Sequence, residues 1–577
     1  MFNRWRLVWV VVFSCMALGL LIISILPYGA FKGLFDSLMP DGNFKSLNEG
    51  NALIFRAFFF LAVLALVALA LLSSGKWRPD MNRLRGEIFS LWHSLHPGKA
   101  ENGFVIVLAV ITLWGAAMRL VYLQVPMSHD ESYTVTVFSP SLWYAITNYH
   151  APNNHILHTI LVHFSTVAFG LQPWAVRLPA LLAGILIIPA TYILGKAIYD
   201  RYTGLLAAAL VSWWPVQINY STSARGYSLI ALFALITLWL GTVVRREKNL
   251  MAWLLIVFFS ALGFYTVPVM LFPFGVLFVW LFMENMVAGQ GDEYRSRADF
   301  LKYWLLAGLA ACVLTLTLYS PIFIYGGARQ FLLNGMPSPL GQAGALILEN
   351  IRGMYSDWAA DISFPLVLIL GTGIVLSLIF HRRLSAHRVP LQVATVVWIG
   401  LILVLQRPDA WSRIWFSLAA LFMIWASAGL AGLIKDIRLG RLGNISAATL
   451  VITVALVGVF VAGARSLASL PHHWASRGRE EQAVLFLKDK LGEGDIIIAP
   501  SPEDAPIWYY SKLYGIPDRY FARSKSFAHA YILTVPVLGQ YRKSVIDGYG
   551  LTDVVDMETL KLVQGYSGLN IYEVTHK

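Results

Sequence analysis

The most regular feature of the chain is a series of apolar runs separated by short polar segments. Several runs hold 18 or more residues, the length that an α-helix needs to cross a bilayer. This pattern predicts a polytopic α-helical membrane protein. The first run, residues 7–27, also resembles a signal peptide, but no small-residue cleavage site follows it, and we favour a retained helix.

The basic residues predict which ends of the runs face the cytoplasm. They gather in the short polar segments, and the positive-inside rule places those segments in the cytoplasm, so consecutive clusters need an even number of spans between them. The count predicts about 13 spans, a cytoplasmic N-terminus and an external C-terminus. The spans are expected at 7–27, 52–73, 103–123, 176–195, 204–219, 224–243, 250–266, 267–284, 303–324, 363–380, 389–406, 411–434 and 445–463.

One apolar segment, 153–170, would make the count odd if it crossed the membrane. On a helix, His155, His158, His163 and two threonines fall on one stripe, opposite isoleucine, leucine and phenylalanine. We therefore expect an amphipathic helix in the membrane interface, with His163 on its water-facing side. Residues 124–175 then form one long external loop.

The composition changes after residue 468. Residues 479–517 have the pattern of helix, turn, buried strand and helix, and 528–535 that of another strand. We expect a small external α/β domain there. The predicted divisions are 1–100 (an N-terminal helix pair with a cytoplasmic loop), 101–467 (the transmembrane catalytic domain) and 468–577 (the external domain).

The overall composition agrees with a membrane protein. Of 577 residues, 57% are hydrophobic and 13% charged, and the net charge of +12 comes mostly from the short loops. That distribution argues against a nucleic-acid ligand. Cys15 and Cys312 both lie in apolar segments, so neither a disulfide framework nor a cysteine metal site is expected.

The motif "MSHDESYT", residues 127–134, directly follows an expected span. Ser128 and Glu131 fit a capping box, which leaves a cap and a catalytic role both open for Glu131. A cap does not need Asp130, and a carboxylate at the external boundary suits a general base. His129 receives no role.

Further along, Asn154, His155 and His158 are candidates for hydrogen bonds to a substrate. A divalent metal at Asp130, Glu131 and His155 is a second interpretation. His155 and His158 are spaced as an i, i+3 metal pair, but no third ligand has a defined spacing. We therefore assign no metal and no certain cofactor.

Two expected external turns carry arginine. "NYSTSARGYSL" at 219–229 contains Arg225, and "QRPDAWSRIWF" at 406–416 contains Arg407 and Arg413. Snorkelling to lipid headgroups, or pairing with Asp409, would explain them without function. A clamp on a phosphate group is the alternative that two such turns beside an acidic motif favour.

These features together resemble the GT-C superfamily of membrane glycosyltransferases, in particular the protein O-mannosyltransferase and aminoarabinose lipid A transferase group. The resemblance rests on the acidic pair, the helix that follows it, "WAVRLPALLAG" at 174–184 and "SARGYSL", and covers about residues 103–440. The family's second acidic position in the turn is Ser223 here, which departs from the pattern.

The resemblance implies transfer of a sugar from a polyprenyl-phosphate donor to a hydroxyl of a glycan, lipid or protein acceptor, with inversion. It implies Asp130 as base with Glu131 beside it, and Arg225, Tyr227 and Arg413 near the donor phosphate, with Arg407 assigned to substrate binding. The site would face the periplasm from a bacterial inner membrane. The alternatives are a transporter or lipid-linked sugar flippase, which usually carries ionisable residues at mid-membrane, and a non-catalytic scaffold.

Overall fold

The computed structural model describes most of the chain. The described residues are 2–36, 81–95, 102–288, 293–333, 343–359, 362–406, 411–436, 478–522 and 524–577, with scattered positions at 49–67 and at 453, 457 and 458. Two predicted spans, 52–73 and 445–463, therefore lie largely outside the described residues, and Arg407 lies outside them altogether.

Helices make up the first part of the chain, up to residue 436. They are α1 (Phe2–Ile25), α2 (Tyr28–Asp36), α4 (Met81–Leu95), α5 (Asn102–Val121), α6 (His129–Tyr133), α7 (Leu142–Thr147), α8 (Ile156–Phe169), α9 (Pro173–Ile198), α10 (Arg201–Trp213), α11 (Pro215–Ser221), α12 (Tyr227–Arg246), α13 (Leu250–Thr266), α14 (Leu271–Ala288), α15 (Arg297–Leu333), α16 (Ala343–Ala359), α17 (Phe364–Ile379), α18 (His381–Leu384), α19 (Leu391–Leu405) and α20 (Ala419–Asp436). The 3₁₀-helix η6 (Ser412–Leu418) precedes α20.

The apolar helices show an integral membrane protein, as predicted. Among the described residues, six helices are long and apolar enough to cross a bilayer, and up to eight if each of two bent pairs counts as one span. Three further apolar helices are shorter, namely α8, α13 and α19. The predicted total of about 13 spans therefore stays a prediction.

Close contacts between helices depend on small residues. A Cβ atom on Gly373 of α17 would lie 2.4 Å from the carbonyl oxygen of Ala426 on α20, and one on Gly429 would lie 2.0 Å from that of Gly373. Within a bilayer, helices gain little from excluding water from one another, so such close packing is a main source of association. The two glycines thus allow α17 and α20 to touch along their backbones.

Helix α8 does not match its predicted orientation. Its polar residues His158 and Thr159 are fully buried, whereas Phe164 and Val167 on the opposite side are 56% and 73% exposed. The prediction of a water-facing polar stripe is wrong for this part of the helix, because neighbouring loops and helices cover it. His163 lies between the two sides and its Nδ1 is 2.7 Å from the Ser139 carbonyl oxygen.

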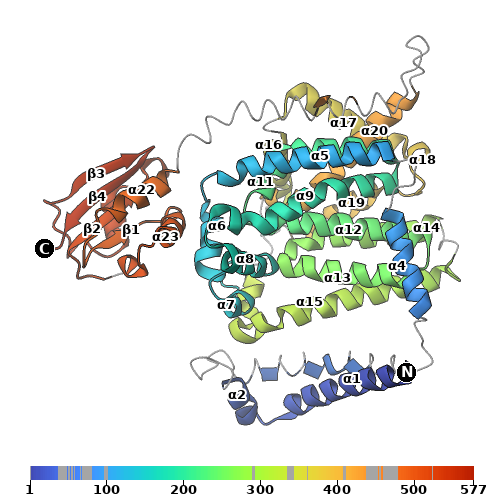
Figure 1. Ribbon diagram of the computed structural model, residues 1–577, viewed down its shortest axis with the longest axis horizontal. Coiled ribbons are helices and arrows are strands. Elements are labelled where there is room, and N and C mark those ends of the chain that lie inside the picture. The colour runs from blue at the N-terminus through green and yellow to red at the C-terminus, as the bar shows by residue number, and fades with distance from the viewer. Residues whose placement is uncertain are drawn as a thin grey trace.

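Residues 478–577 hold a mixed four-stranded sheet with the order β1-β2-β4-β3. Strand β1 (Ile496–Ile498) pairs in parallel with β2 (His529–Thr534), and β4 (Leu569–Thr575) lies antiparallel to both β2 and β3 (Lys561–Tyr566). Helices α22 (Arg479–Lys488), α23 (Asp504–Leu513) and α24 (Arg542–Gly548) accompany the sheet. Figure 1 shows this domain beside the end of the bundle that carries α6, α7 and α8, with α23 nearest to it.

Candidate functional site

The turn of α6 begins with the predicted capping box. Ser128 is the N-cap residue, and its hydroxyl accepts a hydrogen bond from the Glu131 N–H at 3.4 Å. The Glu131 carboxylate in return accepts from the Ser128 N–H at 3.0 Å. A π-helical turn, Thr134–Phe138, follows α6 directly. The capping box gives acceptors to two N–H groups at the start of this very short helix that have no partner within the helix.

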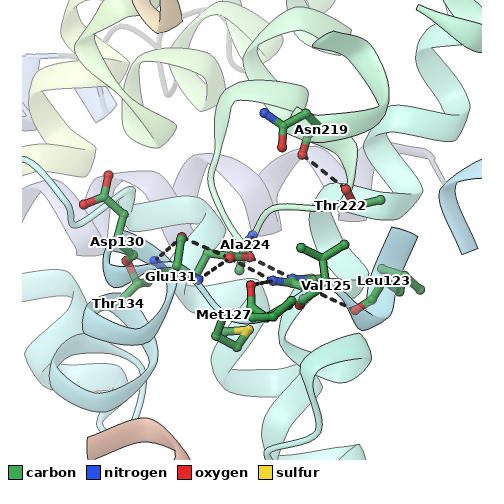
Figure 2. A network of polar contacts seen from close by, with 12 residues as sticks. Leu123, Val125, Met127, Asp130, Glu131, Thr134, Asn219, Thr222 and Ala224 are labelled. Carbon is green, nitrogen blue, oxygen red and sulfur yellow. Dashed lines mark hydrogen bonds and ion pairs between the residues drawn. The ribbon is translucent and has the colours of Figure 1, made fainter. Parts of the chain in front are cut away.

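Glu131 is also the centre of a buried network (Figure 2). Arg177 of α9 donates from Nε and Nη2 to the two carboxylate oxygens, at 2.8 and 2.9 Å. The Ala224 N–H donates to the same carboxylate at 2.6 Å. Arg177 further donates to the carbonyl oxygens of Leu123, Val125 and Pro126. One ion pair therefore joins α6, α9 and the turn before α12.

These contacts bear on the two roles that were open for Glu131, that of a helix cap and that of a catalytic residue. Burial would raise the pKa of its carboxyl, but the charge and hydrogen bonds of Arg177, together with the Ser128 and Ala224 N–H groups, outweigh burial and lower the pKa. Its side chain is 3% exposed and both oxygens are engaged. The carboxylate holds the loops together, and a catalytic role of Glu131 stays a prediction.

Asp130 points away from that network (Figure 2). Its side chain is 35% exposed, and Oδ2 lies 3.3 Å from Nη1 of Arg413 and 3.5 Å from Nη2 of Arg225. Asn153 donates from its side-chain amide to Oδ1 at 3.3 Å. The structure thus brings Asp130 together with an arginine from each of the two predicted turns, although these residues are far apart in the sequence.

Arg225 is almost fully buried by its surroundings. Its Nη1 donates to the side-chain oxygen of Asn153 at 2.5 Å, and its guanidinium lies 5.8 Å from the ring centroid of Tyr227. Tyr227 begins α12 and is 6% exposed. The turn is held by two backbone N–H groups, because Ala224 donates to Glu131 and Gly226 donates to Nδ1 of His155 at 2.8 Å. Arg225 is thereby fixed between two anchored neighbours.

Arg413 is more accessible. It lies on η6, its side chain is 36% exposed, and its guanidinium stacks 4.5 Å from the ring centroid of Trp411. The neighbouring Ser412 donates a hydrogen bond to Asp357 of α16. Arg413 therefore faces Asp130 from an exposed position that an incoming anion can reach.

The three residues predicted to bind substrate beside the acidic pair are buried. The Asn154 amide donates to the carbonyl oxygens of Ala145 and Asn148, both at 2.7 Å, and its oxygen accepts from Thr159. The internal partners of Asn154 and the His155–Gly226 bond give both residues a structural role, and their predicted hydrogen bonds to a substrate stay a prediction. His158 is 0% exposed, and within the described part of the chain neither of its ring nitrogens has a hydrogen-bond partner.

The donor set does not fit the alternative metal site at Asp130, Glu131 and His155. Arg177 takes both oxygens of Glu131, and two guanidinium groups already flank Asp130. Burial and the charge of Arg225 lower the pKa of His155 well below its ordinary value. Positive charge therefore surrounds Asp130, the partly exposed carboxylate of this set. Among the described residues, no group of three or more His, Cys, Asp or Glu side chains is arranged to hold a metal ion.

Three contributors to the site had no place among the predicted residues. Asn153 bridges Asp130 and Arg225, while Arg177 and the Ala224 N–H hold Glu131. The signal for Arg177 was present, because a charged residue within the first turns of an apolar helix needs a partner. No residue pattern in a sequence marks a backbone N–H, such as that of Ala224, as the partner of a carboxylate.

Gly226 has no room for a side chain. A Cβ atom there would lie 2.4 Å from Cγ2 of Thr266 and 3.2 Å from Nδ1 of His155. We expect Gly226→Ala to destabilise the protein by about 1–3 kcal/mol, because it overpacks this contact and displaces the His155 bond. The measurement is the thermal unfolding midpoint of the purified protein in detergent.

Gly103→Ala is the matched control for Gly226→Ala, because a Cβ at this helical glycine would meet nothing within 4 Å. It should leave the midpoint unchanged or raise it slightly. Equal midpoints for the two variants would contradict the tight contact at Gly226.

Comparisons with known proteins show what parts of the chain are similar to. Residues 151–290 match the family model described as dolichyl-phosphate-mannose-protein mannosyltransferase. YkcB of Bacillus subtilis (strain 168), a protein named as a mannosyltransferase, is 27% identical over 181 residues, which are 29% of this chain and 25% of the relative. The chain thus matches only a quarter of the length of that relative.

The fold is similar to that of a solved structure. ArnT from Cupriavidus metallidurans, in the apo state, aligns with a TM-score of 0.54 at 13% sequence identity, covering 82% of this chain and 98% of that one. The predicted resemblance to GT-C membrane glycosyltransferases is confirmed at the level of the fold.

Proposed function

We propose that the chain is a membrane glycosyltransferase that moves a sugar from a polyprenyl-phosphate donor to an acceptor hydroxyl, with Asp130 as the general base. The observation that carries the proposal is the partly exposed Asp130 carboxylate, which lies 3.3 and 3.5 Å from two guanidinium groups. A base beside two phosphate-binding cations is the arrangement that this transfer needs.

In the proposed reaction, Asp130 accepts the proton of the acceptor hydroxyl. The acceptor oxygen attacks the anomeric carbon of the sugar from the face opposite the phosphate, so a new glycosidic bond forms with inversion. The bond between that carbon and the phosphate oxygen breaks, and its electron pair leaves with the polyprenyl phosphate. Arg225 and Arg413 stabilise the charge that develops on this leaving group.

The arginine pair has a second consequence for Asp130. Without donor, the two guanidinium groups pair with the Asp130 carboxylate, at 3.3 and 3.5 Å. A donor phosphate would bind the same cations and leave Asp130 free to accept a proton. Proton abstraction would thus be tied to the presence of a leaving group.

The nature of the donor is supported by two lines of reasoning. The matching family model is named for a dolichyl-phosphate sugar donor. In addition, the sequence pattern predicts that the loops bearing Asp130, Arg225 and Arg413 are external, where nucleotide sugars are absent and a lipid must carry the sugar. We propose that these loops face the periplasm of a bacterial inner membrane.

The decisive experiment uses the purified full chain in liposomes with polyprenyl-phosphate sugars. Mass spectrometry should detect free polyprenyl phosphate and a glycosylated acceptor in equal amounts. Sugar lipid that appears in the opposite leaflet without any released polyprenyl phosphate would instead indicate a flippase and overturn the proposal.

Removing either guanidinium should weaken donor use. Hydrogen bonds to charged groups contribute about 1.5–3 kcal/mol, so we expect Arg225→Gln or Arg413→Gln to raise the KM for the donor about 10- to 100-fold. The measurement is initial rate against donor concentration. Arg519→Gln, which changes an exposed arginine of the C-terminal domain, is the control. An unchanged donor KM in both site variants would contradict the phosphate clamp.

A further inference from the structure

The C-terminal domain and the loops of the site share one hydrophobic core. Met127, Val135, Val176 and Ala224 from the site end of the bundle pack in the same buried cluster as residues of the domain. The domain residues of this cluster include Val484, Leu487, Ile507, Tyr509, Tyr510 and Leu533. The domain is therefore packed directly against the segments that carry the candidate base.

Polar contacts fix helix α23 to α6. The Met127 N–H donates to the hydroxyl oxygen of Tyr510 at 3.0 Å. Nδ1 of His129 lies 2.9 Å from the carbonyl oxygen of Pro502 and 3.4 Å from the carboxylate of Asp504. The contacts from α23 and the turn before it thus reach His129, directly before Asp130, and Met127, three positions before it.

A second tyrosine extends the contact to another loop. The Tyr509 hydroxyl donates to the carbonyl oxygen of Leu171 at 2.6 Å, between α8 and α9. The domain therefore touches both ends of the segment that runs from α6 to α9.

Helix α6 needs such support because of its length. It has five residues and continues into the π-helical turn Thr134–Phe138, and a helical segment this short is unstable on its own. The Glu131 network fixes it from the side of α9, and that network leaves His129 and Asp130 on the other side. Small rotations of α6 would move the Asp130 carboxylate relative to Arg225 and Arg413.

We propose that the C-terminal domain is a positioning element for the reaction, and that Asp504 and Tyr510 of α23, through His129 and Met127, hold Asp130 at the acceptor. This inference rests on the proposed role of Asp130 as base. Asp504 and Tyr510 are positioning residues, because they act through α6 and touch no reacting atom.

The test uses Asp504→Asn and Tyr510→Phe in the full chain. Asp504→Asn removes the charge that faces His129, and Tyr510→Phe removes the acceptor of the Met127 N–H. We expect kcat to fall about 3- to 30-fold while the KM for the polyprenyl-phosphate donor stays constant. Hydrogen–deuterium exchange of the peptide covering 127–138 should speed up in both variants. The exchange experiment needs no enzymatic activity, so it tests whether the domain holds residues 127–138 even if the transfer reaction is assigned incorrectly.

Asp518→Asn is the matched control. Asp518 is another carboxylate of the same domain, and it accepts hydrogen bonds from Trp508 and Lys512 of α23 rather than facing His129. It should change neither kcat nor the exchange of residues 127–138. Unchanged exchange in both Asp504→Asn and Tyr510→Phe would overturn the positioning proposal and leave the base assignment intact.

The pH profile separates positioning from folding. His129 faces Asp504 and Pro502 from the domain and Asp130 from its own helix, and the nearby carboxylate of Asp504 raises the pKa of its imidazole above the ordinary 6.5. A raised pKa means that the charged pair is complete below pH 6.5 and is lost as the pH rises through the raised value.

The advantage of the wild type over Asp504→Asn should therefore be largest below pH 6.5 and shrink as the pH rises. The corresponding ratio for Asp518→Asn should be flat. A constant ratio for Asp504→Asn across this range would exclude the His129 pair from positioning.

Discussion

Asp130→Asn should lower kcat for sugar transfer by about 10²–10⁴-fold, the usual contribution of a general base. Asparagine keeps the size of the side chain and its hydrogen bond partner Asn153 but accepts no proton from the acceptor hydroxyl. Donor binding should persist, because Arg225 and Arg413 lose a competing carboxylate. The measurement is single-turnover transfer at saturating donor, with donor affinity determined separately.

Asp299→Asn is the control for this prediction. Asp299 also pairs with a cation, Lys248 at 2.7 Å, but takes no part in the site. It should retain wild-type transfer. If Asp130→Asn kept more than about a tenth of the wild-type kcat, a base would not be required at this position, and the arginine pair alone would have to account for catalysis.

The sequence could predict which segments meet, because sidedness is encoded locally. Basic residues in the short loops placed 124–175, 219–229 and 406–416 at one end of the bundle. Asp130, Arg225 and Arg413 indeed lie within ion-pair distance. The capping box of Ser128 and Glu131 could also be predicted from the sequence, and it is present.

The direction in which polar side chains point could not be predicted in the same way. The stripe containing His158 has the same spacing whether it faces water or the protein interior, and only the helices packed around it bury it. The contact between His129 and Asp504 joins residues separated by hundreds of positions. Such pairs depend on how two folded parts meet, which no local pattern records.

The buried ion pair between Glu131 and Arg177 should dominate the stability of the site. Their side chains are 3% and 2% exposed, so removing one partner leaves the other charge without compensation. We expect Glu131→Gln or Arg177→Met to destabilise the protein by about 3–5 kcal/mol. The measurement is the temperature at which half of the protein is lost in detergent after a fixed heating time.

A double variant carrying both Glu131→Gln and Arg177→Met is the internal control. It leaves neither charge buried and should recover part of the loss, because replacing a buried pair by neutral groups costs less than breaking it.

The lowered pKa of Glu131 adds a pH dependence. Its contribution is complete above the ordinary value of 4.5 and is lost as the pH falls through the lower folded-state value. Equal pH dependence below 4.5 in the wild type and the double variant, or a double variant no better than the sum of the singles, would show that the ion pair is not what holds α6 to α9.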